Sequence, residues 1–323
     1  MKTPIKQTWP VRVLKRIPPV FWVTVGIMLV FSIINVRFIS LHNMINILQQ
    51  GAVLLIVATG ATLVILSEGL DLSLGSVLTL SGIITVLALG AGIPVLFAAL
   101  LGIACGFVCG SITGLLVSVG NMPPFIATLG IQGVYFGLAL VLTNSVAILT
   151  TNKDYIILGA FIGFVPMAAL IGILFFILVC FVFRYTRFGR YVVALGGNEA
   201  GTRLSGVNTV FWKWLVYAIA GAISGFGGVI LSARLEAADP IVGVGWEFDA
   251  IVATILGGTS FQQGKGSVAG TAFGVLLITI LRNGLNVIRT PAMLQAALIG
   301  TILIVAIVIQ VGLTAQKGRR RIT

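Results

Sequence analysis

The chain has 323 residues, of which 58% are hydrophobic and only 9% are charged. A soluble domain of this size would carry about a quarter charged residues, so the composition excludes an ordinary water-soluble protein. The net charge of +12 does not indicate a nucleic-acid-binding surface, because the basic residues gather at the chain ends and in one central loop. Lipid is therefore the expected main solvent.

Continuous apolar runs predict an all-α, polytopic membrane protein with about ten transmembrane helices, some of them short or broken. A spanning helix needs about 20 apolar residues, whereas the strands of a membrane barrel alternate polar and apolar residues. The eighth run is too short to cross unaided, so we expect a broken or half helix there. The expected spans are 19–37, 48–67, 73–91, 94–118, 123–143, 159–183, 211–233, 247–256, 268–283 and 292–312.

The basic residues predict which side of the membrane each end occupies, because cytoplasmic segments are enriched in Lys and Arg. We expect a cytoplasmic N-terminal tail over 1–18, a transmembrane domain over 19–312 with a cytoplasmic loop at about 184–210, and a cytoplasmic C-terminal tail over 313–323. Ten crossings place both termini on one side. The cytoplasmic basic residues would be Lys2, Lys6, Arg12, Lys15, Arg16, Arg184, Arg187, Arg190, Arg203, Lys213, Lys265, Lys317, Arg319, Arg320 and Arg321.

Glycines repeat every four residues in three of the expected spans. At this spacing they lie on one helix face and let two backbones approach closely, since lipid provides no hydrophobic drive between helices. Close packing is the expected role, and a sliding contact between moving helices is the alternative. The three sets are Gly102, Gly106, Gly110 and Gly114; Gly221 and Gly225; and Gly266, Gly270 and Gly274.

Acidic residues interrupt the apolar pattern at segment 66–76, which contains Glu68, Asp71 and Ser73 and no basic residue. Oxygens of Asp71 and Ser73 are expected to cap the helix that follows, because they can accept from its free first-turn amides. A partly buried corner between two helices is the first interpretation. The alternative is that Glu68 and Asp71 face a polar passage or a partner, because charges inside a bilayer are costly.

Two further polar segments could line a passage. Prolines 123 and 124 predict a helix start, because proline suits the first turn of a helix and not its interior. Around this helix stand neutral hydrogen-bonding groups that suit either a polyhydroxylated solute or contacts between helices: Asn121, Thr128, Gln132 and Asn144. The other segment, 249–259, holds Asp249 and Thr254.

The central loop predicts a short helix. Asn198 can cap a helix from Glu199 to Leu204, and Gly206 can take the positive φ that ends it. A helix on the cytoplasmic side is well placed to dock on another protein, and a solvated loop without a partner is the alternative.

Catalytic and metal-binding patterns are missing from the sequence. Gly264-Lys265 is followed by glycine where a phosphate-binding loop needs Ser or Thr, and neither HExxH nor a cysteine cluster occurs. We therefore expect no metal site, no catalytic residue and no bound cofactor. The acidic residues lie near turns and not deep in spans, which argues against a self-sufficient ion-driven transporter.

Several motifs in order, between about Gly51 and Gly312, resemble the ribose-type permease family, the membrane subunits of bacterial ABC importers for monosaccharides. Glu68 departs from the family pattern, where a glycine or another small residue is expected, and Gln262-Gln263 replace part of a glycine-rich turn. The motifs are TLVILSEGLDLSLGS at 62–76, PFIATLG at 124–130, TRFGR at 186–190, GGNEA at 196–200, RLSG at 203–206 and LGGT at 256–259.

The resemblance implies a permease in the bacterial inner membrane that works with partners. A periplasmic or lipid-anchored binding protein would deliver the sugar, a second permease copy or a related permease would complete the passage, and a separate ATPase would use the ATP. Which sugar is carried stays open, as do a secondary transporter and a membrane enzyme as alternatives. The loop residues expected to couple to the ATPase are Arg187, Gly189, Arg190, Gly197, Asn198, Glu199, Ala200, Arg203 and Gly206.

Overall fold

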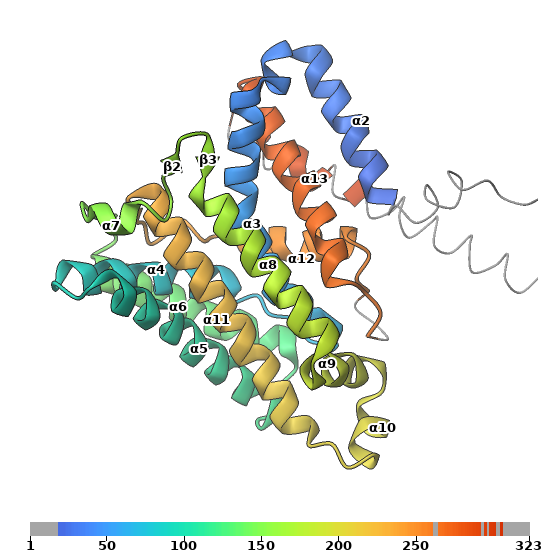
Figure 1. Cartoon of the computed structure of the whole chain (residues 1–323). Helices are drawn as coiled ribbons and strands as arrows, with labels where there is room; N and C mark the ends of the chain where they lie inside the picture. Colours follow the sequence, from blue (N-terminus) through green and yellow to red (C-terminus); the bar gives the residue numbers. More distant parts are fainter. Residues whose placement is uncertain (1–18, 261–263, 292–293, 296, 302–303, 306–323) are drawn as a thin grey trace, which may run out of the picture.

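The computed structural model describes residues 19–260, 264–291, 294–295, 297–301 and 304–305. Helices dominate this part of the chain and pack into a bundle (Figure 1). The tails 1–18 and 313–323 lie outside the described residues, as do Gln262, Gln263 and much of the expected last span. Each expected span from 19–37 to 268–283 overlaps a helix, although α3 begins at Leu41, before the predicted start at 48. These helices are α2 (Pro19–Ile34), α3 (Leu41–Leu66), α4 (Leu74–Gly90), α5 (Val95–Ser118), α6 (Pro124–Thr143), α8 (Met167–Tyr185), α11 (Thr209–Leu235), α12 (Trp246–Leu256) and α13 (Val268–Val287).

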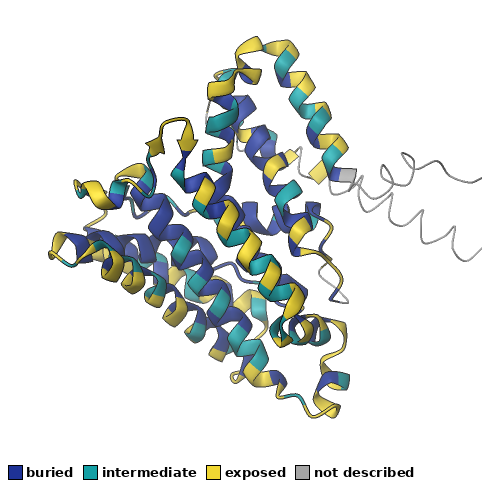
Figure 2. Cartoon of the chain, in the orientation of Figure 1, coloured by how far each residue is buried: buried dark blue, intermediate teal, exposed yellow. Residues whose placement is uncertain are grey.

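Burial divides the long helices into two groups. In the most apolar stretch of each helix, 83% of α3, 78% of α11 and 72% of α13 is buried inside the protein, against 28% of α5, 22% of α6 and 17% of α8. The second group carries exposed Leu, Ile, Val and Phe side chains along its length (Figure 2). Such surfaces suit lipid and not water, so the chain is a polytopic membrane protein, as its composition predicts.

Close backbone contact joins α5 to α11. A Cβ atom added at Gly106 would collide with the Gly221 carbonyl oxygen, and one at Gly110 would collide with the Tyr217 carbonyl oxygen. The glycines of α13 approach α12 in the same way, with Gly274 against Ala253. The glycine repeats therefore provide the close packing that their spacing predicts.

Short elements at the loops correct two of the expected boundaries. The first span ends at Ile34, where Asn35 caps a 3-10 helix, η1 (Val36–Ile39). The sixth span begins only at Met167, because helix α7 (Lys153–Ile156) and a hairpin precede it; the hairpin consists of β2 (Phe161–Ile162) and β3 (Val165–Pro166) and turns at Gly163 with a φ of +62°. A second strand pair joins β1 (Ile148–Leu149) to β4 (Ala237–Ala238).

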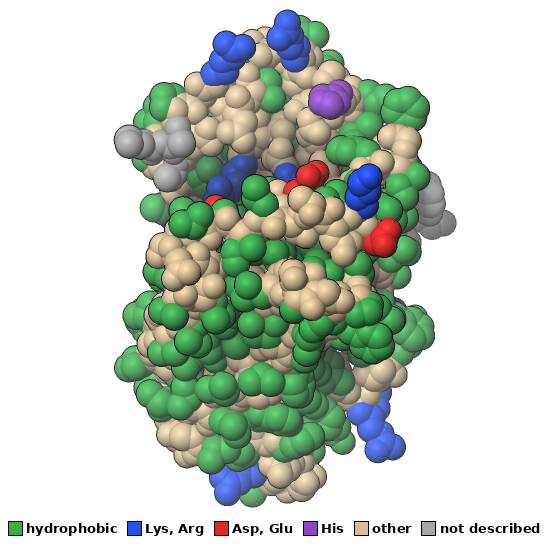
Figure 3. All heavy atoms as spheres, turned by 90° about the vertical axis from the view of Figure 1, so that its left-hand side faces the viewer, with side chains coloured by type: hydrophobic (Ala, Val, Ile, Leu, Met, Phe, Trp, Pro, Cys, Tyr) green, Lys and Arg blue, Asp and Glu red, His purple; other side chains and the backbone are tan. Residues whose placement is uncertain are grey.

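Different elements lie at the two ends of the bundle. Helices α9 (Arg187–Gly197) and α10 (Glu199–Leu204) lie at the start of α11, whereas the β1–β4 pair lies beyond its end (Figure 1). Figure 3 shows hydrophobic side chains over the middle of one face, with Lys and Arg at its upper and lower ends. With 27 residues, α11 is about 40 Å long at 1.5 Å per residue, which is enough to cross a bilayer.

Candidate functional site

The central loop contains the short helix that the sequence predicts. Helix α10 spans Glu199–Leu204, the side-chain oxygen of Asn198 accepts from the backbone N–H of Gly201 at 2.8 Å, and Gly206 has a φ of +83°. The rest of the expected loop is more regular than predicted. Most of it forms the 11-residue helix α9, which includes the expected coupling residues from Arg187 to Gly197.

Two glycines hold α9 against the membrane helices. A Cβ atom at Gly189 would collide with the Phe183 carbonyl oxygen near the end of α8, and one at Gly196 would collide with the Leu66 carbonyl oxygen at the end of α3. Gly197, by contrast, has open space around its Cα. Because α9 contacts two spans directly, a force on the α9–α10 segment reaches the bundle through packed backbone.

Helix α10 exposes most of its surface. Thr202 is its buried residue, and its hydroxyl donates to the carbonyl oxygens of Ala194 at 2.9 Å and Asn198 at 2.8 Å. Ala200 and Arg203 are exposed, and Leu204 is 90% exposed. The sequence motifs did not single out Leu204. The available signal was an apolar residue in a short, otherwise polar helix near basic residues. An exposed leucine beside an arginine suits a protein-docking surface.

An ion pair connects α10 to the next span. The Nζ atom of Lys213, in the first turns of α11, lies 2.6 Å from Oε2 of Glu199. The Glu199 side chain is 45% exposed, so the pair contributes little to folding stability. Its effect is to set how α10 stands relative to α11.

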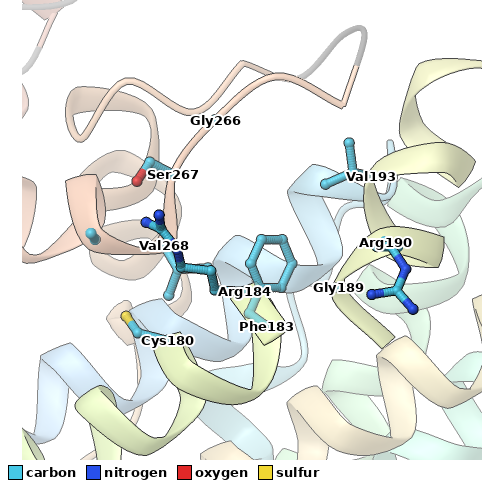
Figure 4. A pocket seen from close by; sticks show the side chains of 10 residues that line it. Cys180, Phe183, Arg184, Gly189, Arg190, Val193, Gly266, Ser267 and Val268 are labelled. Atoms are coloured by element: carbon cyan, nitrogen blue, oxygen red, sulfur yellow. The ribbon is translucent and has the colours of Figure 1, made fainter. Parts of the chain in front are cut away.

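A cavity of about 530 Å³ lies beside α9 and is shown in Figure 4. We call it the α8–α9 cavity; the end of α8, the start of α9 and residues 266–269 line it. Arg184 comes from α8 and Arg190 from α9, so two arginines border the same recess. Such a recess can accept acidic side chains of a docked protein, because guanidinium groups bind carboxylates well.

The first polar corner differs from the predicted helix cap. Oδ1 of Asp71 accepts from the N–H of Ser73 at 2.8 Å and from its hydroxyl at 2.6 Å, while the Ser73 side chain makes no cap hydrogen bond to α4. Ser73 has a helical backbone conformation, so its hydroxyl donates to Asp71 and does not accept from the first turn. Glu68 is an exposed turn residue with a φ of 60°.

This corner lies inside the bundle. The hydroxyl of Ser224, midway along α11, donates to the carbonyl oxygen of Leu74 at 2.6 Å, and Tyr217 donates to Leu70 at 3.3 Å. Asp71 is only 2% exposed, and its Oδ2 atom has no partner within the described residues. The corner therefore buries a carboxylate inside the bundle, where an ionised group is costly.

The neutral polar residues around α6 do not form one cluster. Proline 124 begins the helix, as predicted. Asn121 and Asn144 are exposed turn residues at opposite ends of α6, with φ of 50° and 51°. Thr128 is fully buried, whereas the Gln132 amide reaches α12 and donates to Oε1 of Glu247 at 3.0 Å. Gln132 is therefore the member of this set with a polar partner on another helix.

The two residues of the third segment have different surroundings. The Thr254 hydroxyl lies 3.0 Å from that of Thr62, which lies 2.7 Å from that of Thr271, so three helices share one hydroxyl cluster. Asp249 forms an ion pair with Arg282 of α13. Thr254 thus joins helices together, while Asp249 belongs to a charged pair within the bundle.

Known proteins resemble the chain over most of its length. The family described as "Branched-chain amino acid transport system / permease component" matches residues 43–307. The ribose import permease protein RbsC of Escherichia coli (strain K12) is 38% identical over 286 residues, covering 87% of this chain and 89% of the relative. RbsC of Bacillus subtilis (strain 168) is 37% identical over 287 residues, covering 88% and 89%.

A third relative and one solved structure extend the comparison. The D-allose transport system permease protein AlsC of Escherichia coli (strain K12) is 33% identical over 297 residues, covering 89% of this chain and 91% of the relative. A metal-chelate type ABC transporter in an inward-facing conformation aligns with a TM-score of 0.52 over 89% of this chain and 98% of its own. At 14% identity, that structure shows a shared fold alone.

Proposed function

Because the chain belongs to the family of branched-chain amino acid transport system permease components, we propose that it is the membrane subunit of a monosaccharide ABC importer. The relatives named for ribose and D-allose support a sugar as the solute. As a permease component the chain is not itself an enzyme, so ATP is used by a partner.

The proposed assembly has three kinds of component. A binding protein delivers the sugar, two permease chains form the passage, and an ATPase docks on α10 in the cytoplasm. The permease lies in the bacterial inner membrane with both termini cytoplasmic. The basic groups around α9 and α10 support this orientation, since cytoplasmic segments are enriched in Lys and Arg.

One observation carries the docking proposal: the largely exposed helix α10 directly follows α9, which close backbone contact holds against two spans. Leu204 and Arg203 of α10 face outward, while Gly189 and Gly196 hold α9 against α8 and α3. An ATPase that binds α10 would therefore move the ends of α8 and α3 that contact α9. This is the mechanical link that alternating access requires.

Purification of the permease together with its ATPase tests the proposal. Candidate ATPase subunits are co-expressed with the full chain, the permease is captured by a tag, and the bound ATPase is measured. We expect the ATPase to co-purify with the wild-type chain and to be lost at least tenfold from Leu204→Asp. The matched control is Leu149→Asp, because Leu149 is 78% exposed at the opposite end of the bundle.

Two results would contradict the proposal. A well-folded wild-type chain that captures no candidate ATPase and moves sugar by itself would be a secondary transporter. Equal loss of the ATPase from Leu204→Asp and from Leu149→Asp would show that the effect is not specific to α10.

A further inference from the structure

A second cavity, of about 240 Å³, lies between α3, α11, α12 and α13. We call it the α11–α13 cavity. Its walls include Leu54 of α3 and Leu231 and Leu235 of α11. Its polar and aromatic lining comes from four helices and consists of Gln50, Arg234, Trp246, Asp249, Thr279 and Arg282.

Not all polar side chains of this cavity have a hydrogen-bond or ion-pair partner. Asp249 pairs with Arg282, but the side chains of Arg234 and Gln50 have neither an ion pair nor a hydrogen bond within the part of the chain that the structure describes. Arg234 is half-buried among apolar neighbours. A guanidinium group that is partly removed from water is costly unless something polar binds it, so these groups indicate a polar occupant.

The volume and the lining residues of the cavity indicate what kind of molecule it can hold. Sites for drug-sized ligands measure about 300–1,000 Å³, so a cavity of 240 Å³ suits a smaller molecule such as a single sugar ring. Arg234 and Gln50 provide donors, and the Asp249 carboxylate accepts. The Trp246 ring adds a flat apolar face together with an N–H donor, which matches a sugar with apolar C–H faces and polar rims.

We propose that the α11–α13 cavity is a subsite in which each permease chain holds one neutral monosaccharide as the sugar crosses the permease pair. The proposal rests on the proposed function and adds the place where the solute is held. Arg234 and Gln50 donate to sugar hydroxyls, Asp249 accepts from one, and Trp246 packs against the ring.

The position of the cavity fits the delivery of sugar from outside. Its α11 residues lie at 231–235, whereas α10 precedes the start of α11 at Thr209. The cavity therefore lies in the half of the bundle away from the docking helix. Trp246 and Asp249 stand in the first turn of α12, an 11-residue helix too short to span, and transporters commonly form solute sites at discontinuous helices.

Transport by the complete importer tests this subsite. The permease, its ATPase and the binding protein are reconstituted in liposomes, and D-ribose uptake and ATP hydrolysis are measured together. For Trp246→Ala we expect about a tenfold lower uptake per ATP, the equivalent of one lost contact of about 1.4 kcal/mol. The D-ribose concentration for half-maximal uptake should not change, because the binding protein captures the sugar first.

Control variants separate sugar binding from structural damage. Trp22→Ala removes a tryptophan that is 48% exposed on α2 and should keep the wild-type ratio of uptake to ATP hydrolysis. Trp246→Phe keeps an aromatic face and should recover most of the uptake. Arg234→Gln removes a charge that has no ion-pair partner among the described residues, so it should lower the ratio even if Trp246→Ala fails to fold.

The outcomes distinguish the subsite from the function of the whole chain. If the wild-type importer carries D-ribose and Arg234→Gln and folded Trp246 variants keep the wild-type ratio, the subsite is overturned and the importer stands. If the wild-type assembly carries none of a panel of pentoses and hexoses that includes D-ribose and D-allose, the proposed function fails, and the subsite fails with it.

Discussion

At the scale of single residues, the contact between Glu199 and Lys213 decides how α10 is presented. The two charges lie 2.6 Å apart, and the side chains are 45% and 24% exposed. Pairs this exposed contribute about 0.2–1 kcal/mol, so the permease should fold without the pair. The orientation of α10, and not the stability of the protein, is what depends on it.

A charge-reversal series examines this pair. Glu199→Lys places two cations together, so we expect a several-fold loss of bound ATPase with unchanged permease yield. The exchange of both charges, Glu199→Lys with Lys213→Glu, restores the attraction and should recover at least half of the binding. Co-purification of the ATPase with the tagged permease is the measurement.

One outcome for the double variant would contradict the orienting role of the ion pair. If it binds the ATPase as poorly as Glu199→Lys alone, the pair does not orient α10, and Glu199 instead contacts the partner directly. Asp154→Lys, which makes the same change of charge on α7 outside the α9–α10 region, serves as the control for net charge.

At the scale of helices, the glycine faces decide which helices touch. Two helices approach to backbone contact here where at least one of the facing residues is a glycine, as at Gly106 and Gly221 between α5 and α11. Neighbouring α6 also carries glycines, Gly130, Gly133 and Gly137, but these have open space around them within the chain. A glycine repeat therefore predicts that close contact is feasible, and the fold decides whether a partner is present.

A matched pair of alanine variants measures this difference. Gly106→Ala forces α5 and α11 apart, and over-packing of this kind costs about 1–3 kcal/mol. We expect a lower thermal midpoint and less monodisperse protein in detergent. Gly130→Ala adds the same methyl group where nothing lies within 4 Å and should behave like the wild type. Equal midpoints for the two variants would refute the role of the α5–α11 contact.

At the scale of the whole molecule, α11 separates two ends that should face opposite compartments. Leu204 is exposed beside its start, and Leu149 is exposed in the strand pair beyond its end. Both side chains are accessible in the chain, so each reports the side of the membrane on which it lies. The basic residues near α9 support our proposal that the Leu204 end faces the cytoplasm.

Cysteine labelling tests this arrangement in cells. Cys105, Cys109 and Cys180 are first replaced by alanine, and Leu149→Cys or Leu204→Cys is then introduced. A membrane-impermeant maleimide should label position 149 in intact cells and position 204 only in inverted vesicles. Labelling of both positions from the same side would contradict the predicted orientation, and the cysteine-free chain gives the background.

Local signals in the sequence determined the class of the protein and the position of most helices. Long apolar runs predict spans because lipid demands them, proline 124 starts α6 because its φ is fixed, and Asn198 caps α10 because it lies one residue before it. These effects act within one helical turn, so neighbouring residues suffice to predict them. Asp71 and Ser73 show the limit of such local rules. The N–H and the hydroxyl of Ser73 both donate to the Asp71 carboxylate, in place of the predicted cap on α4.

Only the tertiary structure decided which polar residues meet. Gln132 and Glu247 are 115 residues apart and Thr62 and Thr254 are 192 apart, and no local rule pairs them. The α11–α13 cavity likewise draws Gln50, Arg234 and Trp246 from separate helices. Composition indicates that these groups lie in membrane helices, but helix packing determines their neighbours. A single span could turn its polar face toward several partners. The backbone contacts at the glycines fix one orientation and therefore one set of partners.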